Sequence, residues 1–243
     1  MTANPAENLV QVACRQFKNG AWRDFEDVVS REEIMAVAVA GQQPRFLWAY
    51  PHDLETLALG HVRLEVCGAL QEPVLTTRQG NNFYLDLRMV QPDLSAQDQQ
   101  RADPFPGQLS ARDVLTAMEE LFRIEGLWQD TGCFHRAALY DPAAREFPFM
   151  AQDIGRHNCL DRCAGWLLRE GRDPASLALF VSARVTASLC LKIRKLGVPM
   201  VVSKSAVTTA SLDMAAKSGL TLVGFAREGR FTVFADPKGR IGQ

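Results

Sequence analysis

The sequence predicts an α/β fold in which a smaller, β-rich N-terminal region precedes a domain of alternating strands and helices. Strand-like runs dominate residues 1–92. Residues 93–109 are polar and punctuated by proline, as expected for a linker or a long loop. From residue 110 to 243, strands and helices alternate in units of about 20 residues, a rhythm typical of a parallel sheet with flanking helices.

Apolar runs bounded by turn residues define the elements of the N-terminal region. A first strand over 10–17 ends at an Asn-Gly turn, and a buried strand covers 34–40. A strand over 46–50 stops at a proline, after which Asp53 is a good N-cap for a helix. Two further strands are expected at 73–77 and 82–90, and the second alternates cleanly between apolar and polar residues.

The domain of alternating elements opens with a helix that begins after Ser110, where apolar residues recur at helical spacing. Glycines close the three later helices. The expected strands cover 134–140, 147–151, 177–182, 199–203, 220–226 and 230–235, and the later helices cover 157–169, 185–196 and 208–218.

Composition and charge exclude several classes of protein. Lys and Arg number 27 and Asp and Glu 28, which gives a formal net charge of -1. This balance excludes a globally basic nucleic-acid coat and an acidic disordered tail. No apolar stretch approaches the roughly 18 residues of a transmembrane helix, and the first residues do not resemble a signal peptide.

The six cysteines are too few for a disulfide scaffold, and no two form a Cys-x-x-Cys pair. They stand at positions 14, 67, 133, 159, 163 and 190. We therefore expect free thiols and a reducing, cytoplasmic setting.

The densest polar cluster runs from Gln152 to Arg162, where an expected strand ends and a helix begins. Gly155 allows close approach of the backbone, and the next three residues are Arg156, His157 and Asn158. The N–H groups and the dipole of a helix N-terminus favour an anion, so a phosphate or pterin site is expected here. The alternative is an ordinary surface helix start with Asp153 or Asn158 as its cap.

A second cluster, Thr131-Gly132-Cys133-Phe134-His135-Arg136, precedes an expected strand. Gly132 is expected in a conformation that other residues resist. Cys133 is a candidate nucleophile, with His135 or Arg136 to activate it. The alternative is a small residue at a strand start, with His135 hydrogen-bonded in the core.

Two more polar segments follow strand ends. Ser182 and Arg184 follow one strand, and Ser203, Ser205 and Thr208 follow the next. Each segment alone is weak evidence for a binding site, since serines often only cap helices. Together with the first cluster they lie at one sheet edge, which favours a bound polyanion.

Metal binding is the competing interpretation. Cys159 and Cys163 lie four residues apart on one expected helix, with His157 adjacent and His135 available. Free cysteines are often simply buried, however, and we expect no structural metal. The common motifs of P-loops, dinucleotide folds, metalloproteases and serine hydrolases are absent from the sequence.

The order of these motifs resembles the formate dehydrogenase accessory sulfurtransferase family. Thr131-Gly132-x-x-His135-x-Ala137-Ala138-Leu139 and Asp153-Ile154-Gly155-Arg156-His157-Asn158-x-Leu160-Asp161 carry most of the resemblance. The other matching segments, in the same order, are Ser182-x-Arg184-Val185, Lys192, Gly197-Val198-Pro199, Ser203, Ser205-Ala206-x-Thr208 and Gly224-Phe225-x-Arg227-x-x-Arg230-Phe231, and Pro51 to Gly60 match more loosely.

This resemblance implies a cytidine-deaminase-like three-layer α/β domain behind the β-rich region, and a cytoplasmic homodimer. It also implies a maturation factor for a molybdenum or tungsten enzyme of the formate dehydrogenase type. Such a factor takes sulfur from a cysteine desulfurase and delivers it to the molybdenum (or tungsten) bis(molybdopterin guanine dinucleotide) cofactor, for insertion into the apo-enzyme. No nucleic-acid or membrane partner is implied.

The sequence differs from this family in the loop whose cysteines carry the sulfur. The family's persulfide cysteines belong to a Cys-Gly-x-Cys-Gly loop, and the matching stretch, 94–109, contains no cysteine. Cys133, Gln152 and Ala183 also replace the family's usual residues. Cys133 is therefore the candidate sulfur carrier, or else the chain is a non-catalytic chaperone that binds cofactor without transferring sulfur.

The remaining alternative is a zinc deaminase. The sequence does not contain the Pro-Cys-x-x-Cys zinc ligands or the His-x-Glu motif with the general acid–base residue of such enzymes. The residues expected to bind the cofactor are Thr131, Gly132, His135, Gly155, Arg156, His157, Asn158, Ser182, Arg184, Ser203, Ser205 and Thr208.

Overall fold

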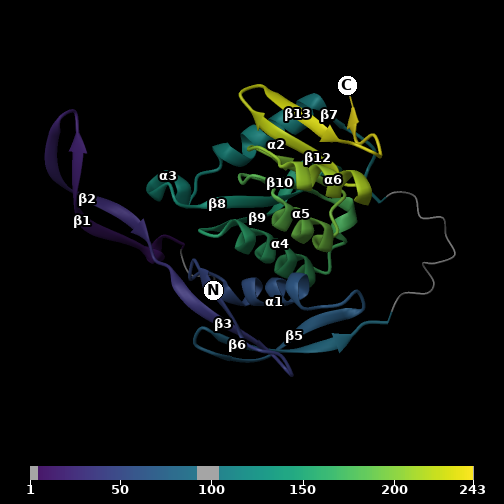
Figure 1. Ribbon diagram of the computed structural model, residues 1–243, viewed down its shortest axis with the longest axis horizontal. Helices are drawn as coiled ribbons and strands as arrows, with labels where there is room; N and C mark the ends of the chain where they lie inside the picture. Colours follow the sequence, from purple (N-terminus) through teal and green to yellow (C-terminus); the bar gives the residue numbers. More distant parts are fainter. Residues whose placement is uncertain (1–4, 92–103, 243) are drawn as a thin grey trace.

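The computed structural model describes residues 5–91 and 104–242. The chain opens with a short 3₁₀ turn, η1 (Pro5–Asn8), and a hairpin of β1 (Leu9–Lys18) and β2 (Ala21–Ser30) that projects from the body of the molecule (Figure 1). The expected Asn-Gly turn joins the strands, with positive φ at Asn19 and Gly20. The sequence prediction missed β2, since its charged residues stand in adjacent pairs, Arg23-Asp24 and Glu26-Asp27, and leave no alternation of apolar and polar residues.

A second, four-stranded sheet has the order β4-β3-β6-β5 and carries one helix on its inner face (Figure 1). Its strands are β3 (Glu33–Val39), β4 (Arg45–Ala49), β5 (Gln71–Gln79) and β6 (Asn82–Met89). The helix α1 (Leu54–Glu65) begins as expected at Asp53, whose carboxylate accepts a hydrogen bond from the Thr56 N–H. These strands and this helix confirm the expected elements of the N-terminal region.

The largest sheet has six strands in the order β13-β12-β11-β10-β8-β9. Their bounds are β8 (His135–Asp141), β9 (Glu146–Asp153), β10 (Ala178–Val181), β11 (Met200–Ser203), β12 (Thr221–Arg227) and β13 (Arg230–Ala235). The expectation of a parallel sheet was wrong, because only β10, β11 and β12 are parallel neighbours. Short turns join β8 to β9 and β12 to β13, and such turns allow only antiparallel pairing.

Helices cover both faces of this sheet, which gives three layers. One face packs against α2 (Ala111–Arg123), and the other packs against α4 (Arg156–Glu170), α5 (Ala187–Leu196) and α6 (Thr209–Ser218). The expected start at Ser110 is confirmed by a capping box with Asp113. Gly171, Gly197 and Gly219 end the last three helices in the left-handed conformation, also as expected.

Short elements complete the chain. The helix α3 (Leu127–Thr131) follows α2, η3 (Pro174–Ser176) precedes β10, and β7 (Leu109–Ser110) pairs in parallel with β14 (Ile241–Gly242). None of the helices within the described residues is long and apolar enough to cross a membrane. Residues 93–103 of the predicted linker lie outside the described part of the chain, and the division at 92 and 109 stays a prediction.

The β-rich region joins the large domain through an unusually close contact of α1 with α4. A Cβ atom built on Gly60 would lie 1.6 Å from the Asp161 carbonyl oxygen, and one on Gly165 would lie 2.0 Å from that of Thr56. Only glycine permits two helix backbones to approach this closely. The contact holds α1, and with it the β-rich region, against α4, the helix that begins at the polar strand ends.

Candidate functional site

The polar segments singled out in the sequence meet at one edge of the six-stranded sheet. His135, the first residue of β8, pairs with Asp153, the last residue of β9. Val181, the last residue of β10, pairs with Ala137 on one side and with Ser203 of β11 on the other. The ends of β9, β10 and β11 and the start of β8 therefore form one continuous polar edge.

Ser182 is the hydrogen-bonding centre of that edge. Its hydroxyl oxygen accepts the backbone N–H of Arg136 at 3.0 Å and lies 3.4 Å from His135 Nδ1. The Ser205 hydroxyl donates to the Ser182 carbonyl at 2.9 Å. Three segments distant in sequence are thereby tied together beside the half-buried ring of His135.

Two of the predicted binding residues at this edge have structural tasks. Ser203 is fully buried, and its hydroxyl donates to the Ala183 carbonyl at 2.8 Å. Thr208 is the N-cap of α6, where its side chain forms a capping box with Ser211. Both hold the strand ends in place, and the hydroxyl of Ser203 is out of reach of a ligand.

A buried carboxylate organises the start of α4. Asp153 Oδ1 accepts the N–H of Gly155 at 3.0 Å and an amide hydrogen of Asn158 at 2.9 Å. The other amide hydrogen of Asn158 goes to the Trp48 carbonyl at 2.8 Å, so this side chain has no N–H left for a ligand. A Cβ on Gly155 would lie 2.9 Å from Asn158 Nδ2, which explains the glycine.

Arg162, the last residue of the polar cluster seen in the sequence, was assigned no role there, but it is central to this site. Its guanidinium binds Asp153 Oδ2 through Nε at 2.9 Å and Nη2 at 2.7 Å. It also donates to the carbonyls of Tyr50, at 2.9 Å, and of His52 and Asp53. The side chain links the start of α4 to the loop before α1, and so positions the polar edge relative to the β-rich region.

Positive charges surround the two histidines of this edge and, together with burial, lower the pKa of both rings. Burial lowers the pKa of His135, and the charges of Arg156 and Arg184 lower it further, against a smaller opposing effect of Asp153. Burial also lowers the pKa of His157, together with Lys192 and Arg156. His157 Nε2 lies 3.2 Å from the Ser188 hydroxyl at the start of α5.

Two helix N-termini face this edge without a side-chain cap among the described residues. Gly155 precedes α4 and Thr186 precedes α5, and neither accepts a capping hydrogen bond. The first-turn N–H groups are therefore available to an anion. Arg156 is half-buried and Arg184 exposed, so both guanidinium groups can add positive charge there.

Cys133 lies in a pocket of about 390 Å³ at the β8 end of the edge. The thiol is exposed, and Sγ lies 3.3 Å from the Thr131 hydroxyl, which also accepts the Cys133 N–H at 3.3 Å. Gly132 ends α3 with φ of 69°, which confirms the expected special conformation. The turn that follows α3 thereby presents the thiol to the pocket.

Aromatic rings and cations form the rest of this pocket. Phe122 and Trp128 line it together with Arg136 and Lys204. Lys204 Nζ lies 3.7 Å from the centre of the Phe122 ring, and the guanidinium carbon of Arg136 lies 5.8 Å from it. Arg136 is recognisable in the sequence as a charged residue inside an apolar strand, whereas no pattern there marks the other three.

The other cysteines of the large domain are poor candidates for chemistry. Cys159 and Cys163 are buried in the core, and burial raises the pKa of both thiols. Burial also raises the pKa of Cys190. Within residues 5–91 and 104–242, no group of three or more His, Cys, Asp or Glu side chains is arranged to hold a metal ion.

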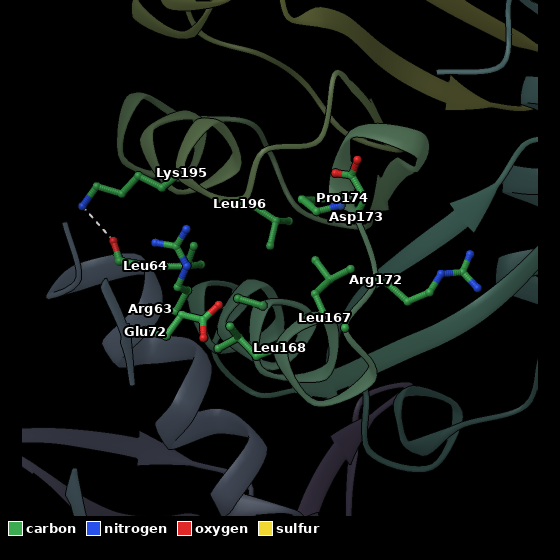
Figure 2. A pocket seen from close by; sticks show the side chains of 12 residues that line it. Arg63, Leu64, Glu72, Leu167, Leu168, Arg172, Asp173, Pro174, Lys195 and Leu196 are labelled. Carbon is green, nitrogen blue, oxygen red and sulfur yellow. Dashed lines mark hydrogen bonds between the residues drawn. The ribbon is translucent and has the colours of Figure 1, made fainter. Parts of the chain in front are cut away.

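A second hollow, of about 340 Å³, lies at the opposite edge of the sheet, between the ends of α4 and α5 and the helix α1 (Figure 2). Leu167, Leu168 and Leu196 form its apolar part, and Lys195 closes one side by donating to the Leu64 carbonyl at 2.7 Å. No predicted binding residue lines it. The strand-end edge and the Cys133 pocket are therefore the candidate site.

The fold matches that of a solved structure from Desulfotalea psychrophila, described as a formate dehydrogenase accessory protein. The TM-score is 0.79 at 21% sequence identity, and the match covers 96% of this chain and 99% of that one. The molecule therefore has the fold of that accessory protein.

Sequence comparison identifies the family. The FdhD/NarQ family model matches residues 87–241. The chain is 37% identical over 248 residues to the sulfur carrier protein FdhD of Bacillus subtilis, covering 92% of this chain and 94% of that one. It is 28% identical over 261 residues to the FdhD protein of Chromobacterium violaceum, covering 94% and 96%. The chain belongs to the FdhD/NarQ family, which confirms the resemblance drawn from its motifs.

Proposed function

We propose that this protein is a maturation factor for a molybdenum or tungsten enzyme of the formate dehydrogenase type. It binds the bis(guanine dinucleotide) form of the pterin cofactor at the strand-end edge and assists its sulfuration, with Cys133 as the sulfur carrier. The observation that carries the proposal is the exposed Cys133 thiol in a pocket that is continuous with an anion-attracting edge.

The edge suits a ligand that carries several phosphates. Arg156 and Arg184 are its side-chain cations, and the uncapped N-termini of α4 and α5 add N–H donors. The lowered pKa values of His135 and His157 favour the neutral rings, which can donate or accept a hydrogen bond. Ser182, Ser203, Ser205, Thr208, Gly155 and Asn158 shape the edge from behind.

Sulfur transfer needs an accessible thiolate at the ligand. In the proposed step the Cys133 thiolate attacks the terminal sulfur of a persulfide on a cysteine desulfurase. The new S–S bond forms on Cys133, the old one breaks, and the desulfurase thiolate leaves with the electron pair. The terminal sulfur of the Cys133 persulfide is then transferred to the bound, reduced cofactor, which is the substrate. An electron pair of the cofactor forms the new bond to sulfur, the S–S bond breaks, and the Cys133 thiolate leaves with the electron pair of that bond.

The test is persulfide formation on the full chain. Incubation with a cysteine desulfurase and cysteine should add one sulfur atom to the peptide that contains Cys133, seen by mass spectrometry. Cys67, whose thiol is half-buried and whose pKa burial raises, is the internal control and should stay unmodified. An unmodified Cys133 under these conditions would remove the carrier role.

The second candidate function is a non-catalytic chaperone that holds the cofactor or the apo-enzyme. The absence of cysteine between Cys67 and Cys133 in the sequence favours it, since the family's cysteine pair belongs to that interval. The two functions differ in one variant. Cys133→Ser should abolish activation of the client enzyme by a sulfur carrier and leave a chaperone fully active.

The family membership also supports the remaining parts of the proposal. These are a cytoplasmic setting, a homodimer, and two protein partners, a cysteine desulfurase and a formate dehydrogenase apo-enzyme. Co-purification of the full chain with each partner, and the mass of the free protein in solution, test them separately.

A further inference from the structure

The pocket around Cys133 has a cationic wall that the transfer of sulfur from a protein donor does not require. We propose that this pocket also takes sulfur directly from a small oxyanionic donor of the thiosulfate class, with Lys204 holding the oxyanion while Cys133 accepts the sulfur. This inference rests on the proposed role of Cys133 as a sulfur carrier, and it adds a second class of donor.

Among the described residues, the two cations of the pocket are not in ion pairs with carboxylates. Arg136 and Lys204 both line the pocket, and within residues 5–91 and 104–242 neither has a carboxylate within 4.0 Å. Burial lowers the pKa of Lys204, and the charges of Arg227 and Arg136 lower it further, against a smaller opposing effect of Glu228, as expected where cations outnumber the one nearby carboxylate. A cavity with two cations of this kind attracts a dianion.

The two cations have different tasks. Arg136 is only 3% exposed, and its guanidinium donates to the carbonyls of Leu121 and Ile124 and to the Gln129 side chain. It therefore fixes the α2–α3 connection that forms one wall. Lys204 Nζ lies above the Phe122 ring and makes no hydrogen bond within the described part of the chain, so its three N–H groups are free for an oxyanion.

The proposed reaction exchanges one S–S bond for another. The Cys133 thiolate attacks the outer sulfur of thiosulfate, an S–S bond forms on Cys133, and the bond between the two thiosulfate sulfurs breaks. Sulfite leaves with the electron pair of that bond, and Cys133 becomes a persulfide; no oxidant or reductant is consumed. Negative charge shifts onto the departing oxyanion, so a cation beside it stabilises the transition state.

The pocket geometry agrees with this assignment. Trp128 is 54% exposed and covers one side, while the left-handed turn at Gly132 keeps the thiol on the surface of the cavity. A volume of about 390 Å³ is large enough for a small dianion beside the thiol.

The experiment incubates the full, reduced chain with thiosulfate at low ionic strength. We expect sulfite release equal to the amount of protein and one added sulfur atom on the Cys133 peptide, but none on the Cys14 or Cys67 peptides. Lys204→Met should slow sulfite release about tenfold, because the pocket loses its free cation. Lys204→Arg, which keeps the charge, should retain most of the rate.

A neutral reagent controls for changes in the thiol itself. Iodoacetamide should modify Cys133 at the same rate in Lys204→Met as in the unaltered chain, whereas negatively charged iodoacetate should react more slowly in the variant. Equal sulfite release from Lys204→Met and the unaltered chain would overturn the role of Lys204. Absence of sulfite from the unaltered chain would overturn the inference as a whole.

The two proposals fail separately. A Cys133 persulfide that forms with a desulfurase and cysteine, but not with thiosulfate, overturns only the thiosulfate reaction. A persulfide that forms with thiosulfate alone supports the inference and removes the desulfurase route. No persulfide from either donor overturns both.

Discussion

Arg162 and Asp153 form an ion pair in the interior of the protein, with Arg162 Nη2 2.7 Å from Asp153 Oδ2 and side chains that are 5% and 0% exposed. The same arginine holds three carbonyls of the loop before α1, and the same aspartate holds Gly155 and Asn158. One pair thus connects the β-rich region to the start of α4.

Removing the carboxylate charge from this pair should destabilise the protein strongly. Asp153→Asn leaves Arg162 buried without a counter-charge, and we expect a loss of about 3–5 kcal/mol in the free energy of unfolding, measured by urea denaturation. The matched control is Asp24→Asn, which breaks the exposed pair of Arg15 and Asp24 and should lose less than about 1 kcal/mol. Equal losses in the two variants would contradict the linking role of Asp153.

Gly60 should not tolerate a methyl group, although alanine is the better helix former. In an exposed helix Gly→Ala stabilises by about 1 kcal/mol, but here the added Cβ would meet the Asp161 backbone at 1.6 Å. We expect Gly60→Ala to lose about 3 kcal/mol or more, because α1 must move away from α4.

Gly20→Ala is the control for Gly60→Ala, since its Cβ would meet nothing within 4 Å and only the positive φ is strained. That variant should lose about 1–2 kcal/mol in the same denaturation experiment. A Gly60→Ala protein as stable as the unaltered chain would show that the helices do not cross this closely.

Features that depend on neighbouring residues were predictable from the sequence. The cap at Asp53 and the capping box at Ser110 need only the residues of one helical turn, and both are where the sequence places them. The convergence of the polar strand ends was also predictable, because strands that are parallel in direction end at one edge. Here β9 and β10 run in the same direction because β8, which lies between them, is antiparallel to both.

Features that depend on distant partners were not predictable. Arg162 binds carbonyls that are 112 and 109 positions away, and a backbone carbonyl leaves no mark in a sequence. Lys204 follows the end of β11, and Phe122 belongs to α2. The two side chains are in contact only because α2 packs on the sheet next to that strand end. β8 and β13 are antiparallel to their neighbours in the sheet because short turns join β8 to β9 and β12 to β13. The regular alternation of strands and helices along the sequence indicated a parallel sheet instead.

Gly132 should be needed to present the Cys133 thiol. Its φ of 69° favours glycine, and the surrounding space is open, so Gly132→Ala should lose about 1–2 kcal/mol through backbone strain alone. Gly132→Asn, whose side chain adopts the left-handed conformation more readily, should lose less. Iodoacetamide should modify Cys133 at a different rate in Gly132→Ala, and an unchanged rate would show that the turn does not position the thiol.

The stability of the protein should fall as the pH is lowered below 6.5, and His135 and His157 should contribute to this fall. Both have a pKa below the ordinary value of 6.5 in the folded protein, chiefly because of burial. As the pH drops through 6.5 the unfolded chain binds protons that the folded chain does not, so the free energy of unfolding decreases. Below both values the folded protein is protonated too, and this contribution levels off.

The measurement is the free energy of unfolding between about pH 5 and 7, where most carboxylates stay ionised. The double variant His135→Gln/His157→Gln should show a smaller slope than the unaltered chain, and the slope that remains includes His52, whose pKa burial also lowers. Because Gln keeps a hydrogen-bonding group but cannot take up a proton in this range, the difference in slope isolates the titration of the two rings. An equal slope in both proteins would mean that the two histidines bind protons as easily in the folded protein as in the unfolded chain. That result would contradict the lowering of the His135 pKa by burial and by the nearby charges of Arg156 and Arg184.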